Sequence, residues 1–161
     1  MSELSDLLER YRRGPELAAT ILTGVYGEEE DYLSAPGKWS IRQIMAHLAD
    51  SEIVTAHRFR QMIAEDSPTL IAYDQEKWAA NLDYNRRKPK QALETLRRGR
   101  AENYELLQAL PESAFERKGL HTERGPITLR YLLELNVQHT ENHSRQMQSV
   151  RDEYKKAKAG K

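Results

Sequence analysis

The sequence contains no cysteine among its 161 residues. A disulfide framework, thiolate metal ligands and a cysteine nucleophile are therefore excluded. No apolar run approaches the roughly 20 residues that a membrane-spanning helix needs, and the N-terminal MSELSDLLERYRR lacks the apolar core of a signal peptide. With a mean hydropathy of −0.82, these absences predict a soluble, cytoplasmic protein.

An excess of charge of one sign is missing as well, because 25 Lys and Arg residues balance 25 Asp and Glu residues. This balance gives no general attraction to nucleic acid or to an anionic membrane, and we expect neither as a partner. The most basic stretch holds Arg97, Arg98 and Arg100, interleaved with glutamates. It predicts a solvated helix face with surface ion pairs.

Apolar residues recur at helical spacing through most of the chain. Long helices are expected over 3–23, 40–66, 89–110 and 128–152, the first interrupted at Gly14-Pro15. Short helices are expected over 74–84 and 112–117, with loops over 24–38, 67–73 and 119–126. The pattern predicts an all-α fold, a four-helix bundle with short extra helices. Residues 1–154 would form a single helical-bundle domain, and 155–161 a basic, frayed tail.

The helix boundaries have local signals. Ser40, with Gln43 three residues later, forms a capping box. Asp74 and Thr128 are further N-cap candidates, and Pro89 suits the first turn of a helix.

Three histidines carry most of the chemical information. His139 and His143 are four residues apart on one predicted helix, so their imidazoles share a face. His47 lies on the flank of the apolar stripe of another helix. Together they could hold one metal ion and leave positions open for water or substrate. Imidazole ligands suit zinc, nickel, copper and iron. A spacing of four alone is a weak signal, so the histidines could also simply pack in the core.

Other polar and aromatic residues near these histidines have two possible roles each. Asp50 and Asn136, each one turn from a histidine, could act in catalysis or orient a ligand, or could be structural. Glu141 leaves the apolar stripe and is expected in solvent. Candidates for the wall of a substrate pocket, which could equally pack the bundle ends, are Trp39, Tyr73 and Trp78.

The two remaining histidines fall outside the pattern. His57 is turned away from the face of His47 and is expected at the surface. His121 lies in a predicted loop and is expected in solvent, with a place at the mouth of the pocket as the alternative. No glutamate follows His139, where a zinc peptidase of the H-E-x-x-H type would have one, so that class is disfavoured.

Three segments resemble the DinB/YfiT-like superfamily: GKWSIRQIMAHLADS at 37–51, YDQEKW at 73–78 and the helix at 129–147. The order of one histidine, followed about ninety residues later by an H-x-x-x-H pair, is similar too. The resemblance implies an up-down-down-up four-helix bundle, a nickel or zinc ion, and a homodimer. It also implies that the metal ligands are His47, His139 and His143.

The resemblance implies a metal-dependent enzyme, either a hydrolase that activates water or an S-transferase that activates a low-molecular-weight thiol. Its substrate would be a small molecule. Because the chain has no cysteine, a sulfur nucleophile would have to come from a cosubstrate. The alternative from another class is a non-catalytic, stress-related dimer that binds metal through the same histidines.

Overall fold

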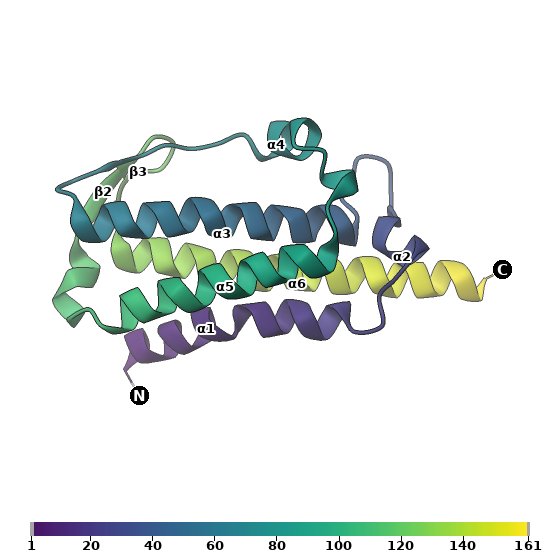
Figure 1. Ribbon diagram of the computed structural model, residues 1–161, viewed down its shortest axis with the longest axis horizontal. Helices are drawn as coiled ribbons and strands as arrows, with labels where there is room; N and C mark the ends of the chain where they lie inside the picture. The colour runs from purple at the N-terminus through teal and green to yellow at the C-terminus, as the bar shows by residue number, and fades with distance from the viewer. Residues whose placement is uncertain (1, 161) are drawn as a thin grey trace.

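The computed structural model describes residues 2–160. Its four long helices are α1 (Glu3–Leu22), α3 (Ile41–Ala64), α5 (Pro89–Gln108) and α6 (Leu129–Ala159). Helices α1 and α6 run in one direction and α3 and α5 in the other (Figure 1), and both α1 and α3 pack against α5 and α6. The predicted up-down-down-up four-helix bundle is therefore confirmed. None of the described helices is long and apolar enough to cross a membrane.

The residues predicted to begin the helices do so in the structure. Ser40 and Gln43 form both hydrogen bonds of a capping box, at 3.2 and 2.9 Å. The side chains of Asp74 and Thr128 cap α4 (Gln75–Asn81) and α6, and Pro89 is in the first turn of α5. Two short 3₁₀ helices, η1 (Tyr84–Arg86) and η2 (Glu112–Glu116), flank α5.

The predicted interruption of the first helix is wrong. Helix α1 continues through Pro15, although this proline cannot donate to the carbonyl of Tyr11 four residues earlier. Arg100 replaces the missing donor, with Nη1 2.7 Å from that carbonyl oxygen. A side chain at Gly14 would collide with the same guanidinium, since its Cβ would lie 2.5 Å from Nη1. Gly14 therefore leaves space for the Arg100 guanidinium, and Pro15 leaves the Tyr11 carbonyl free to accept a hydrogen bond from it.

The segment after α1 and the C-terminal segment also differ from prediction. The expected loop 24–38 contains a short helix, α2 (Glu28–Asp31), and the expected frayed tail is helical as far as Ala159. Two ion pairs join them: Arg151 to Glu29 at 3.0 Å and Lys158 to Glu28 at 2.6 Å. Residue 161 lies outside the described residues.

Two of the predicted loops contain a small sheet. Strand β2 (Lys118–His121) pairs antiparallel with β3 (Gly125–Thr128) and parallel with β1 (Thr69–Leu70). The sheet joins the return segment after α3 to the hairpin that precedes α6 (Figure 1). It was missed because strands of two to four residues are too short for alternation to be recognised.

A buried polar network joins all four long helices. Glu52 of α3 and Arg100 of α5 form an ion pair at 2.8 Å, each side chain only 3% exposed. Tyr11 of α1 and Asn103 of α5 also donate to Glu52, at 2.7 and 3.0 Å. Arg100 donates in turn to Thr140 of α6 at 3.0 Å. The expectation of a solvated basic face is therefore wrong for Arg100.

Removal of one member of the network should strongly destabilise the fold. Arg100→Met would leave the Glu52 carboxylate buried without its cation, which typically costs 3–5 kcal/mol, so we expect a loss of about that size. Arg97 forms exposed ion pairs with Glu16 and Glu94, and the control Arg97→Met should cost less than about 1 kcal/mol. Urea unfolding measures both.

A double variant separates the loss of the pair from the burial of an unpaired charge. Glu52→Leu combined with Arg100→Met should be more stable than Arg100→Met alone, because it buries no unpaired carboxylate. Equal free energies of unfolding for Arg100→Met and Arg97→Met would contradict the assigned role of the network.

Candidate metal centre and adjoining pocket

Three histidines converge between α3 and α6. One ligand atom each from His47, His139 and His143 lies within 4.8 Å of the others. The Nε2 atoms of His47 and His139 are 2.8 Å apart, and the three ring centroids are 4.5–4.8 Å from one another. The predicted histidine group is therefore assembled, with one member from α3 and two from successive turns of α6.

Burial keeps these imidazoles neutral. It lowers the pKa of His47 and of His139 to about 3, helped by the neighbouring histidines. Burial also lowers the pKa of His143, and the Gln146 amide oxygen, 2.7 Å from its Nδ1, works against this shift. That contact directs the Nδ1 proton of His143 to Gln146 and leaves the Nε2 lone pair free as a ligand.

The donor set fits a transition metal. Nitrogens bound at 2.0–2.1 Å with tetrahedral angles would be roughly 3.3 Å apart, and small side-chain adjustments can reach this from the observed separations. At most one hydrogen bond joins the Nε2 atoms of His47 and His139, and Nδ1 of His47 is buried without a hydrogen-bond partner. Neutral imidazoles that converge in this way are typical ligands of zinc or nickel.

Trp39 closes the side of the histidine group next to α4. Its ring stacks on His143 at 6.5 Å and meets His47 edge-on at 5.1 Å. A small recess of about 150 Å³ beside it is also lined by His143, Gln75 and Gln146. Trp39 thus serves both roles considered from the sequence, because it packs the bundle end and walls the site.

Asp50 does not contact His47. Its carboxylate is buried on another side of α3, where Tyr84 donates to it at 2.8 Å and Arg87 at 3.1 Å. The suggested hydrogen bond to His47 is therefore absent, and Asp50 is not part of the wall of either cavity near the histidines. Through these contacts Asp50 holds the η1 turn against α3.

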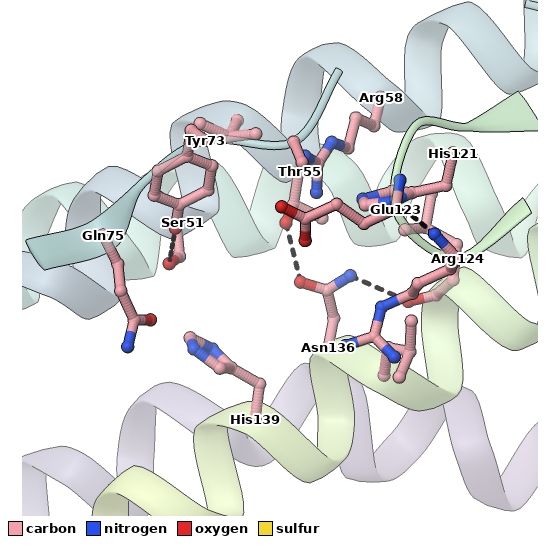
Figure 2. Close-up of a pocket in the computed structure, with 14 residues that line it drawn as sticks. Ser51, Thr55, Arg58, Tyr73, Gln75, His121, Glu123, Arg124, Asn136 and His139 are labelled. Atoms are coloured by element: carbon pink, nitrogen blue, oxygen red, sulfur yellow. Dashed lines mark hydrogen bonds between the residues drawn. The ribbon is translucent and has the colours of Figure 1, made fainter. Parts of the chain in front are cut away.

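A larger pocket of about 220 Å³ opens on the other side of the histidine group. Figure 2 shows His139 and Gln75 at one end of it and Arg58, His121 and Arg124 at the other. Asn136 lies between the two ends and accepts from Thr55 at 2.7 Å, while its Nδ2 donates to the Leu132 carbonyl. Of the two catalytic candidates, only Asn136 therefore reaches the pocket.

Ser51 and Tyr73 bring hydroxyl groups to the same pocket. The two oxygens are 2.7 Å apart, and either can be the donor. Burial raises the pKa of Tyr73, which keeps this phenol protonated at neutral pH. Trp78 packs behind the Tyr73 ring at 4.4 Å, so of this pair only Tyr73 lines the pocket.

The expectation of a solvent-exposed His121 is wrong, and the structure agrees with the alternative position at the pocket. His121 is buried on β2 and lines the pocket, where its Nδ1 accepts from the backbone N–H groups of Glu123 and Arg124. His57 is exposed, as predicted. Glu141 lies away from the histidines and pairs with Arg10 at 2.9 Å. Sequence spacing could have identified Gln146, which lies three residues after His143 on the same helix.

The fold and the site together define a class, a four-helix bundle with a three-histidine group able to hold one metal ion. The chain belongs to the DinB superfamily, whose sequence model matches residues 5–147. YfiT of Bacillus subtilis is 30% identical over 132 residues, which are 80% of this chain and 74% of that protein. A relative from Oceanobacillus iheyensis is 28% identical, over 89% of this chain and 78% of its own length.

Solved structures agree with this fold. The structure of YfiT, described as a probable metal-dependent hydrolase with an unusual four-helix bundle topology, matches with a TM-score of 0.86 at 24% identity. The match covers 93% of this chain and 87% of YfiT. A mycothiol-dependent maleylpyruvate isomerase matches with a TM-score of 0.70 at 15% identity, over 89% of this chain and 60% of that one.

The buried histidines make the metal-free protein sensitive to acid. The pKa of His47 and His139 is about 3 when folded and about 6.5 when unfolded. The unfolded state therefore binds more protons below pH 6.5, and stability falls as the pH drops from 6.5 towards 3. We expect the contribution of each of these two histidines to the free energy of unfolding to fall by on the order of 1 kcal/mol between pH 6.5 and 5.5.

Urea unfolding in the presence of a chelator, at pH 6.5 and 5.5, measures this loss. The double variant His47→Gln, His139→Gln should show a flatter dependence, whereas His57→Gln, at an exposed position, should keep that of the wild type. Identical slopes for all three proteins would show that the buried histidines are not responsible.

Proposed function

We propose that this protein is a metal-dependent enzyme in which His47, His139 and His143 hold one divalent transition metal ion, nickel or zinc. The supporting observation is the convergence of three neutral, largely buried imidazoles beside a polar pocket. An ion with three neutral ligands supplies a Lewis acid that lowers the pKa of a water or thiol bound beside it. His139, as part of the pocket wall, would direct that chemistry into the pocket.

Two reaction types are compatible with the site: hydrolysis, or transfer of a low-molecular-weight thiol to an electrophile. The description of YfiT as a probable metal-dependent hydrolase supports the first. The thiol dependence of the isomerase with the same fold supports the second. A cosubstrate would provide the sulfur in a transfer, because the chain has no cysteine.

The pocket side chains would bind and orient a small-molecule substrate. The protonated Tyr73 and Ser51 offer an O–H to a substrate oxygen, since only one hydrogen bond joins them. The Asn136 amide is held by Thr55 and Leu132 and keeps a second N–H on Nδ2. On the opposite side, the Trp39 ring packs against His47 and His143.

Metal content tests the proposed ligands. Untagged wild-type protein should contain about one equivalent of nickel or zinc by elemental mass spectrometry, and His139→Ala should lose it. His57→Ala, at an exposed histidine outside the group, should keep the metal. A wild type that binds neither metal after reconstitution would falsify the proposal.

Turnover assays on the loaded protein separate the reaction types. Ester or amide cleavage without thiol would identify a hydrolase, and consumption of an electrophile only with added thiol would identify a transferase. Stoichiometric metal with neither activity across both screens would instead favour a non-catalytic metal-binding protein. The homodimer stays a prediction, which sedimentation of the loaded protein would test.

A further inference from the structure

The pocket end farthest from the histidines holds an arginine with unused hydrogen-bonding capacity. Arg58 of α3 donates from Nη2 to the Ile71 carbonyl at 2.6 Å. Its Nε is buried without a hydrogen-bond partner, and no carboxylate among the described residues forms an ion pair with it. A partly buried guanidinium with unpaired donors is costly, so an anion entering the pocket would find an unsatisfied partner.

Two further donors lie on the same wall. The Arg124 side chain comes from the β2–β3 turn and forms no ion pair within the described part of the chain. His121 accepts two backbone N–H groups at Nδ1, so its proton is on Nε2, which can donate. Burial lowers the pKa of His121, and the positive charges of Arg58 and Arg124 lower it further. This imidazole is therefore neutral.

Glu123 limits the charge of this wall. It lines the same pocket (Figure 2) and its charge partly offsets that of Arg58. Two arginines, one glutamate and a neutral histidine give a formal charge of +1. That charge matches one carboxylate better than a phosphate dianion.

We propose that Arg58 and Arg124 form a subsite for a carboxylate of the substrate. The inference rests on the proposed function, because the reacting part of the same molecule would lie at the histidine end. Ser51, near that end, and Arg58 are seven residues apart on α3, about 10 Å along the helix axis. The substrate would therefore be a small molecule whose carboxylate is several bonds from its reacting atom. That molecule is either the thiol of a transfer reaction, or the electrophile or ester on which the site acts.

Ligand pairs that differ only in this charge test the proposal. Cobalt-loaded protein is titrated with ω-mercaptocarboxylates of three to six carbons and with their amides, followed by the cobalt absorption spectrum. Hydroxamates with the same tails replace the thiols in a second series. The best acid should bind about tenfold more tightly than its amide, since a charge-assisted hydrogen bond typically contributes at least this much.

The two series distinguish the two possible sources of the carboxylate, according to the series in which the acid binds more tightly than the amide. A preference among thiols assigns it to the thiol, and one among hydroxamates to the ester or amide substrate. Equal binding of acids and amides in both series would overturn the subsite. Stronger competition by inorganic phosphate than by acetate would overturn the assignment to a carboxylate.

Variants test the two arginines separately. Arg124→Gln changes an exposed side chain and should reduce the acid preference to threefold or less, with unchanged amide binding. Arg58→Gln should do the same, with its melting temperature measured because the contact with Ile71 is lost. Arg98→Gln, at an exposed position on α5, is the matched control and should keep the full preference.

A metal-free measurement makes the subsite testable even if the proposed metal function fails. Glutarate is titrated into apo protein, and the Arg58 Nε–H resonance is followed by ¹H–¹⁵N NMR. A saturable shift would support the subsite if the dissociation constant for glutarate rises at least threefold in Arg124→Gln. No shift, or an equal one in the variant, would refute it. Failure of cobalt to bind would refute only the proposed metal centre.

Discussion

The buried ion pair of Glu52 and Arg100 is the constraint on which the rest of the bundle depends. A charge in the interior is tolerated only with its partner and further hydrogen bonds in place. Here those partners come from each of the four long helices. The helices therefore cannot slide or rotate independently without leaving a buried charge unpaired.

The same network fixes the register of the histidines. His47 lies five residues before Glu52 on α3, and His139 immediately precedes Thr140 on α6. Because Arg100 contacts both Glu52 and Thr140, the axial positions of α3 and α6 are set beside the candidate metal site. Arg100 also helps to lower the pKa of His139. A structural ion pair thereby helps to keep an imidazole in the neutral form that binds metals.

Sequence periodicity predicts the bundle and its histidine group because long amphipathic helices repeat their signal over many turns. His139 and His143 lie on a stripe that Leu132 and Met147 define, and both apolar residues are buried. The burial of Arg100 could not be recognised in this way, because its partners Tyr11 and Glu52 lie 89 and 48 residues earlier in the chain. The burial of His121 in a strand could not be recognised either, because that strand pairs with β1 across some fifty residues. Long-range pairing, rather than local propensity, decides both positions.

The up-down-down-up order explains why the pocket has two chemically different ends. A chain that leaves α3 must return along it before α5 can run parallel to α3 (Figure 1), and this segment brings Tyr73 and Gln75 over the histidines. The β2–β3 hairpin joins the start of that segment and brings His121 and Arg124 to the far end. The helices thus supply the neutral histidine group, and α3 also supplies Arg58. The β2–β3 connection adds the charged side chains of Glu123 and Arg124 beside Arg58 of α3. The pocket is therefore lined jointly by side chains of α3 and α6 and by the connections before α4 and α6.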